Sequence, residues 1–314
     1  MGGNEPDLKQ TSKVALAALA VLFIGSVVFF KERLFFADFS FFAFVIANDG
    51  VLPIINQRYG EFVTQILPYL AQKLHFPLRT ILMSYAACFN LIYLFVAVLL
   101  VYIFKYYKFA ILMALYYFLM ISTSGIVAND VSLAIALMFL FFGSIIYLGN
   151  KRVNIFFVLV PFIFLAFITI SAHIIIIIPM SFLWVYMLIE KKNWPFTAPH
   201  TILLTSVLGA VIAFRYFSTV NAPQSYHGNH LNGIQKLSFQ DIFDCFSTPV
   251  VRIFLLRCIS NYWLAIIIFI ISLVSLIINR KILLTILTLF ACLGYIILMG
   301  ITYPDTTFNF KDRQ

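Results

Sequence analysis

A stretch of thirty-five residues without a formal charge, from Asn154 to Leu188, constrains the fold more than any other feature of this sequence. It is too long for one helix across a hydrocarbon core about 30 Å thick, and it suits two helices joined by a tight turn. The segment TISAHIIIIIP around His173 is the natural place for that turn. The whole composition agrees with a membrane protein, since 63% of the residues are hydrophobic, 11% are charged and the mean hydropathy is +1.01.

Windows of about 19 apolar residues predict nine transmembrane helices. Their ranges are 14–30, 80–104, 109–127, 131–148, 154–171, 174–189, 201–218, 259–278 and 282–301. The predicted fold class is therefore all-α, a polytopic transmembrane helix bundle of about nine spans. We expect the bundle to cover 14–302, between a cytoplasmic N-terminus at 1–13 and an outer C-terminal tail at 303–314. An outer-membrane barrel is not expected, because barrel strands are shorter and alternate in polarity.

Lysine and arginine residues in the short connections predict the orientation of these helices. With the N-terminus in the cytoplasm, every inner connection carries a basic pair, as the positive-inside rule requires. The pairs are Lys9 and Lys13, Lys105 and Lys108, Lys151 and Arg152, Lys191 and Lys192, and Arg280 and Lys281. The long segments 31–79 and 219–258 then lie outside, where their length weakens the rule. The net charge of +9 comes largely from short clusters between apolar runs, so we expect no nucleic-acid partner.

The outer segment 31–79 is long for a loop and too hydrophobic to be disordered, so we expect it to lie on the membrane. Within 59–74 one side has the apolar spacing of an interfacial helix and the other side is polar. The apolar set is Phe62, Val63, Ile66, Leu67, Leu70 and Leu74, and the polar set is Glu61, Thr64, Gln65, Gln72 and Lys73. Pro68 is expected to kink or restart this helix. A second apolar helix, LFFADFSFFAFVIA, is expected to end at the turn Asn-Asp-Gly.

Most acidic residues lie on the predicted outer side, and three of them differ from ordinary loop charges. Asp38 lies among phenylalanines, where a carboxylate must reach the surface, find a partner or face a wet cavity. Asp49 belongs to a strong turn sequence and is the better placed acid if that turn faces inward. Asp130 is the only charge in SGIVANDVSL. It is either a turn former and helix N-cap or a carboxylate that holds a metal ion or a proton at the mouth of the bundle.

Several basic or ionisable residues on the same side are candidates for binding a phosphate group. Arg58 is either an interfacial anchor or a bidentate phosphate clamp. Arg215, Arg252 and Arg257 either each snorkel to the headgroups or together bind a lipid-linked diphosphate. His173 is either a turn residue or, as an ionisable group inside the membrane, part of a functional site. The candidate substrate-binding residues are Arg58, Glu61, His173 and Arg215.

This layout resembles the integral-membrane glycosyltransferases of the GT-C superfamily. Members share a cytoplasmic N-terminus, one span, a long outer loop with acidic residues and membrane-lying helices, and a second acid in the short outer turn after the third span. The corresponding features here are the segment 31–79 with Asp38 and Asp49, the helix at 59–74, and Asp130. The resemblance covers roughly the first 190 residues. In the family, two adjacent acids often follow the first span. This sequence departs from that pattern, because Asp38 and Asp49 stand eleven positions apart.

The resemblance implies a transferase that moves a sugar from a polyprenyl-phosphate donor to an acceptor at the outer face of a bacterial inner membrane. It implies Asp38 or Asp49 as the catalytic base and Asp49 and Asp130 as ligands of Mg²⁺ or Mn²⁺, where such an ion is used. It also implies that basic residues bind the lipid-linked sugar. Two other functions stay open, a transporter or flippase of lipid-linked saccharide and a non-catalytic membrane subunit. Membrane lipids are expected partners in every case.

Overall fold

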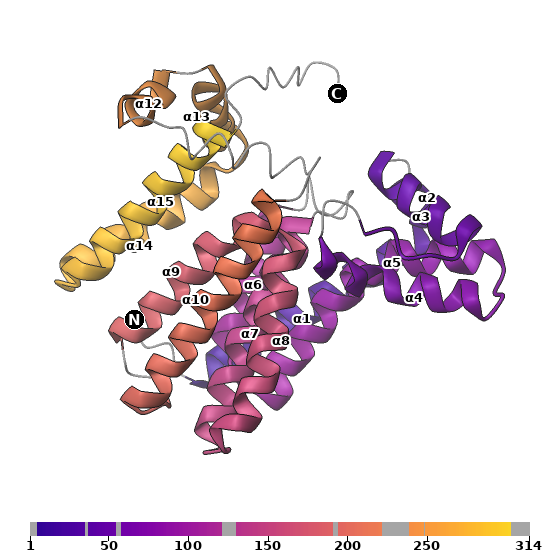
Figure 1. Cartoon of the computed structure of the whole chain (residues 1–314), viewed down its shortest axis with the longest axis horizontal. Coiled ribbons are helices and arrows are strands. Elements are labelled where there is room, and N and C mark those ends of the chain that lie inside the picture. The colour runs from indigo at the N-terminus through magenta and orange to yellow at the C-terminus, as the bar shows by residue number, and fades with distance from the viewer. Residues whose placement is uncertain are drawn as a thin grey trace. The chain divides into compact units, whose positions relative to one another are not determined.

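The computed structural model describes residues 5–34, 37–54, 58–120, 130–190, 194–221, 239–247 and 249–302. Within these ranges the chain is helical and contains no strand (Figure 1), which confirms the predicted all-α class. Contacts divide the chain into two compact units, Met1–Ile176 with Pro195–Arg215 and Ile177–Trp194 with Tyr216–Gln314. The predicted C-terminal tail at 303–314 lies outside the described residues, as does much of the second outer loop.

Five helices are long and apolar enough to cross a membrane, and a sixth span results if two helices that bend against each other count as one. This is the composition of a multi-pass membrane protein. The five are α1 (Glu5–Val28), α5 (Leu78–Val98) with its continuation to Ile103, α7 (Asp130–Asn150), α8 (Ile155–Ala172) and α10 (Ala198–Val220).

The remaining four predicted spans coincide with apolar helices that are short, bent or only partly described. They are α6 (Tyr107–Leu119), α9 (Ile177–Glu190), α14 (Trp263–Ile278) and α15 (Ile282–Thr302). A thirteen-residue helix such as α6 is about 20 Å long, which is less than the hydrocarbon thickness. The number of nine complete spans therefore stays a prediction.

In the first unit α7 packs against α5, α6 and α8, and α1 packs against α5 and α6 (Figure 1). Glycines allow α7 to approach its neighbours closely. A Cβ atom at Gly143 would lie 2.7 Å from a methyl carbon of Leu100, and one at Gly149 would lie 2.4 Å from the ring of Pro195. Small residues at such contacts are typical of helices that associate inside a membrane, because close packing replaces the hydrophobic driving force there.

Polar side chains connect the helices in the interior of this unit. The Tyr93 hydroxyl on α5 donates to the backbone carbonyl of Ser132 on α7 at 2.5 Å. The Tyr117 hydroxyl on α6 donates to Asn90 Oδ1, and Asn90 Nδ2 donates to the carbonyl of Leu22 on α1 at 3.0 Å. Interhelical hydrogen bonds of this kind contribute about 1 kcal/mol each in membrane bundles. They fix the relative positions of four helices.

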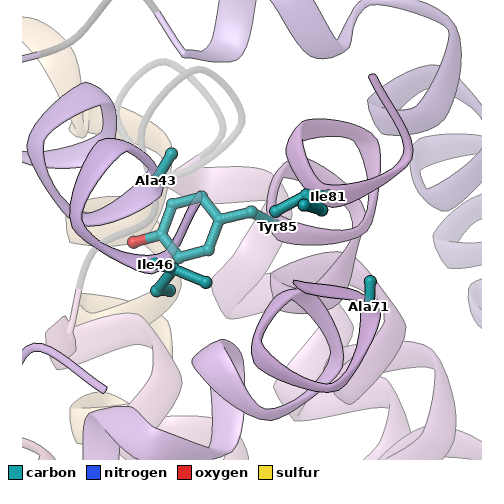
Figure 2. Packing of buried hydrophobic residues seen from close by; sticks show 5 residues of the cluster. All are labelled: Ala43, Ile46, Ala71, Ile81 and Tyr85. Carbon is teal, nitrogen blue, oxygen red and sulfur yellow. The ribbon is translucent and has the colours of Figure 1, made fainter. Parts of the chain in front are cut away.

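The predicted outer segment of the first unit forms α2 (Phe30–Arg33), α3 (Ala37–Asp49) and α4 (Phe62–Lys73). α3 ends at the Asn-Asp-Gly turn as predicted. Gly50 adopts a φ of +60°, in the left-handed region that favours glycine, and its N–H donates to the carbonyl of Ile46 at 3.2 Å. α3 and α4 pack on the beginning of α5, where Tyr85 reaches toward α3 (Figure 2). The buried cluster consists of Ala43, Ile46, Ala71, Ile81 and Tyr85.

The predicted amphipathic helix at 59–74 consists of a 3₁₀ turn, η1 (Tyr59–Glu61), followed by α4. Pro68 lies inside α4, so the helix does not restart there. The buried residues of η1 and α4 are Gly60, Glu61, Gln65, Pro68 and Ala71, whereas Ile66, Leu67, Leu70 and Leu74 are exposed. Glu61 and Gln65 therefore face protein together with Pro68 and Ala71, whereas most of the apolar residues face outward. This is the reverse of a helix on the surface of a soluble protein, and it suits a helix whose outer side meets lipid.

The second unit contains α9, α12 (Phe239–Asp244), a 3₁₀ turn η5 (Cys245–Ser247), α13 (Pro249–Asn261), α14 and α15. α15 packs against all of the others. The rings of Phe254 on α13 and Tyr295 on α15 lie 6.1 Å apart. α13 and α14 meet at an angle of 91°, so the span predicted at 259–278 is broken at Tyr262 and its straight part begins at Trp263.

Two contacts join connections that the basic residues assign to the same, inner side. In the first unit, Asn150 Nδ2 at the end of α7 donates to the hydroxyl of Tyr106, just before α6, at 2.8 Å. In the second unit, the carboxylate of Glu190 at the end of α9 pairs with the ammonium group of Lys281, just before α15. Each contact thus joins two helix ends that the sequence assigns to one side of the membrane, and the orientation itself stays a prediction.

Candidate functional site

One arginine and two carboxylates from distant parts of the chain meet where α7 begins. Arg58 lies just before η1, and Glu61 is the last residue of η1. Nη1 of Arg58 lies 3.3 Å from Oε1 of Glu61 and also forms an ion pair with Oδ2 of Asp130, the first residue of α7. A carboxylate at this position also suits the positive end of the α7 dipole. The guanidinium group thus bridges two acids that are 69 residues apart in the sequence, 61 and 130.

Gly60 holds η1 directly against α8. A Cβ atom at this position would lie 2.3 Å from the carbonyl oxygen of Ile168 and 2.5 Å from the amide nitrogen of Ala172. Only a residue without a side chain permits such an approach, since real Cβ atoms do not come this near to backbone atoms. The contact places Arg58 and Glu61, on either side of Gly60, next to the last turn of α8.

Glu61 is buried, with 2% of its surface exposed, and its environment favours the protonated form. Burial raises the pKa of its carboxyl group to about 9, and the nearby Asp130 carboxylate raises the pKa further than Arg58 lowers it. A hydrogen bond with Asp130 acts in the same direction. The surroundings of Glu61 thus favour its protonated form beside the ion pair of Arg58 and Asp130.

Arg215 adds a second cation to this region. It lies near the end of α10, is 2% exposed, and is close enough to Tyr59 and Arg58 to interact with them electrostatically. Aromatic rings connect η1, α8 and α10. The ring of Tyr59 stacks on Phe167 of α8 with centroids 6.3 Å apart, and Phe167 lies 6.4 Å from Phe214. The region thus combines two guanidinium groups with aromatic surface.

His173 marks the end of α8, where the backbone becomes extended before the short turn η4 (Ile174–Ile176). The residue is buried, and its Nδ1 accepts a hydrogen bond from the N–H of Ile175 at 3.2 Å. In the neutral ring the proton is then on Nε2. The same turn of α8 contains the buried hydroxyl groups of Thr169 and Ser171, neither of which has a hydrogen-bond partner within the described protein.

The structure brings some of the predicted site residues together and leaves others apart. Arg58, Glu61 and Asp130 are in direct contact, and Arg215 is near Arg58. Asp49 ends α3 in an exposed position and accepts a hydrogen bond from Asn48 at 2.6 Å, and no contact among the described residues joins it to Asp130. The side chain of Asp38, although on α3, lies outside the described residues.

Sequence reasoning did not identify Tyr59, Gly60, Thr169 or Ser171 as site residues. Only Gly60 carried a usable signal. A glycine at the start of a predicted amphipathic helix can mark a place where the backbone comes close to another element. The other three are ordinary residues of an apolar helix or loop until the contact between η1 and α8 is known.

A metal site with Asp49 and Asp130 as ligands was expected where an ion is used. Among the described residues no group of three or more His, Cys, Asp or Glu side chains is arranged to hold a metal ion. Asp130 is paired with Arg58, and burial raises the pKa of the neighbouring Glu61. The requirement for Mg²⁺ or Mn²⁺ stays a prediction.

Comparison of the whole chain with protein-family models, with curated proteins and with solved structures gives no match. The resemblance to the GT-C superfamily therefore rests on topology and on the placement of acids and arginines.

Proposed function

We propose that the chain is a GT-C-like glycosyltransferase that moves a sugar from a polyprenyl-phosphate donor to an acceptor. It acts at the outer face of a bacterial inner membrane, as part of the machinery of the cell envelope, with its N-terminus in the cytoplasm. One observation carries the proposal, namely that Arg58 joins Glu61 of the first outer segment to Asp130 at the start of α7. These are the two regions in which the superfamily carries its acids.

The proposed reaction needs a base for the acceptor hydroxyl. The acceptor oxygen forms a bond to the anomeric carbon, its proton passes to a carboxylate, and the bond from the anomeric carbon to the phosphate oxygen breaks with its electron pair on the phosphate. Asp130 suits the base because its side chain is 26% exposed, whereas Glu61 is buried and its raised pKa favours the protonated form. Asp38 and Asp49 remain alternatives for this role.

The two arginines suit the leaving phosphate. Negative charge develops on the phosphate as the sugar departs, and fixed cations in a region shielded from water stabilise such charge strongly. Arg58 is held in place by two acids, and Arg215 is almost fully buried, so neither has to reorganise during the reaction. Glu61 is proposed to fix the orientation of Arg58. In its protonated form it does so without neutralising the positive charge of the guanidinium group.

A transporter or flippase of lipid-linked saccharide is the second candidate. Glu61 favours it, because a buried carboxyl that can take up and release a proton suits proton-coupled transport. In this case Arg58 and Asp130 would bind a substrate that leaves unchanged.

The test is sugar transfer by the purified full-length chain in proteoliposomes with a panel of radiolabelled polyprenyl-phosphoryl hexoses. Asp130→Asn and Arg58→Gln are each expected to lower the rate by about 100-fold or more, in line with the loss of a general base or a phosphate ligand. Asp49→Asn and Asp38→Asn are measured beside them, and Asp244→Asn, an exposed acid on α12, is the matched control. Full activity in all four site variants would reject the proposal. Movement of the donor between leaflets without transfer would favour the flippase.

A further inference from the structure

The geometry of the second unit points to a membrane-binding surface on α13, and we propose that α13 lies in the plane of the membrane and binds anionic phospholipid headgroups through Arg252 and Arg257. The sugar-transfer proposal assigns no role to these two arginines. The membrane-binding surface does not depend on that function.

The orientation of α13 follows from its neighbour α14. α14 has sixteen residues without a charge, and none of them is buried in the protein. Its length is about 24 Å, near the lower limit for a helix that crosses the hydrocarbon core. An apolar helix with no buried face in the chain needs lipid around it. We therefore take α14 as a helix that crosses the membrane.

The ends of α14 carry the residues typical of a membrane–water interface. Tyr262 and Trp263 stand at its beginning, and Trp263 is 59% exposed. Asn279, Arg280 and Lys281 follow its end. Aromatic residues at one boundary and basic residues at the other are the usual anchors of a span. The bend at Tyr262 thus lies at the level of the headgroups, and because it measures 91°, α13 continues along the surface.

The composition of α13 fits this position. Its exposed side chains include Ile253, Leu256 and Ile259, the last two 58% and 61% exposed, so a large part of its surface is apolar. Val251 is buried and Phe254 packs on Tyr295 of α15, which fixes the opposite side of α13 to protein. An apolar exposed side on a helix in the headgroup region is the pattern of an interfacial helix.

The charge of α13 determines which lipids it prefers. Arg252 and Arg257 are its only charged residues, and Arg252 is exposed between apolar neighbours. Long basic side chains extend from such positions to the phosphate level, and each favours an anionic surface. α13 itself contains no acidic residue. The partner is therefore an anionic phospholipid.

The experiment uses the full-length chain with the photoreactive residue p-benzoyl-phenylalanine in place of Ile259, reconstituted in vesicles of phosphatidylcholine and phosphatidylglycerol. After irradiation, mass spectrometry identifies what is attached. The expected product is a lipid adduct in which phosphatidylglycerol is enriched about fivefold over its share of the vesicle. In R252Q/R257Q the enrichment should disappear, and R252K/R257K should restore it. The control position is Ile271 in the middle of α14, 58% exposed, where lipid adducts should follow the bulk composition.

Three results would overturn the proposal. Absence of any lipid adduct at Ile259, with normal adducts at Ile271, would place α13 in water. A covalent dimer at Ile259 would show that a second copy of the chain covers this surface instead. Lipid adducts that show no enrichment of phosphatidylglycerol while Arg252 and Arg257 are both present would contradict the preference for anionic headgroups. Each variant is first checked for unchanged elution as a folded species, and the lysine variant tests the charge without removing it.

Discussion

α7 and α14 are both long apolar helices, yet they meet different surroundings. Of the most apolar eighteen residues of α7, 78% are buried inside the protein, whereas no residue of α14 is buried. Alanine, serine and glycine recur along α7 and let neighbouring backbones approach, for example at Gly143. α14 consists mostly of isoleucine and leucine with two serines and one alanine.

The difference shows that apolar character alone does not determine what covers a helix. Both helices are apolar, so the hydrophobic effect places both of them in the membrane. The size of their residues then determines whether protein or lipid covers them. A helix with small residues packs against protein and can carry a polar group such as Asp130 into a defined site. A helix with branched residues all round meets lipid and holds no site of its own. The following variants test this distinction, beginning with the largest expected effect.

Removal of a large side chain should separate the two environments most clearly. Phe141 on α7 is completely buried, and Phe290 on α15, beside α14, is 73% exposed. Phe141→Ala leaves a cavity and should lower the free energy of unfolding by about 3–5 kcal/mol. At position 290 lipid can fill the space that the smaller side chain leaves. Phe290→Ala should therefore lower the free energy of unfolding by less than about 1 kcal/mol. Denaturant unfolding in detergent micelles measures both, and equal losses would break the comparison.

The contact between η1 and α8 extends the same reasoning to backbone packing. Gly60→Ala introduces a methyl group 2.3 Å from the carbonyl oxygen of Ile168, so η1 must move away from α8 at a cost of about 1–3 kcal/mol. Gly209→Ala in α10 is the matched control, because no atom lies within 4 Å of its added Cβ. The control should be neutral or more stable by up to about 1 kcal/mol, since alanine favours the helix. A sugar-transfer assay of Gly60→Ala should show loss of activity as well.

The buried carboxyl of Glu61 should make the stability of the protein depend on pH. Its pKa is raised from 4.5 to about 9 in the folded protein, so between these values the folded state binds a proton that the unfolded state does not. The free energy of unfolding should therefore fall as the pH rises from about 5 to about 9 and level off above the folded pKa. Thermal unfolding at a series of pH values measures this.

Glu61→Gln, which keeps the shape and removes the titration, should flatten the dependence. Glu32→Gln, at an exposed acid on α2, is the control, and its stability should depend on pH in the same way as that of the wild type. Identical slopes in wild type and Glu61→Gln would mean that Glu61 is ionised in the folded protein.

Much of the architecture could be predicted because hydrocarbon thickness and helical periodicity act locally. The five long spans, the helix after Tyr59 and the turn at Gly50 all follow from runs of neighbouring residues. The side of α4 that faces protein was not foreseen. Amphipathic patterns are usually interpreted with water as the polar partner, but here Glu61 and Gln65 face the protein and the apolar residues face outward.

The site itself depends on contacts that no local pattern reveals. Asp49 and Asp130 looked similar in the sequence, as single acids in predicted outer turns, and only Asp130 reaches Arg58. That contact depends on Gly60 and on the end of α8, more than a hundred residues later in the chain. The break at Tyr262 was missed for a related reason, because no proline or glycine marks it and the apolar run continues on both sides.

A double-mutant cycle of Arg58→Gln and Asp130→Asn in the transfer assay tests most directly whether these residues act as one site. Residues that act as a unit show strong non-additivity. We predict that each single variant loses about 100-fold or more and that the double variant is no slower than the slower single one. Losses that simply multiply, or single variants that keep the rate of the wild type, would contradict a shared site.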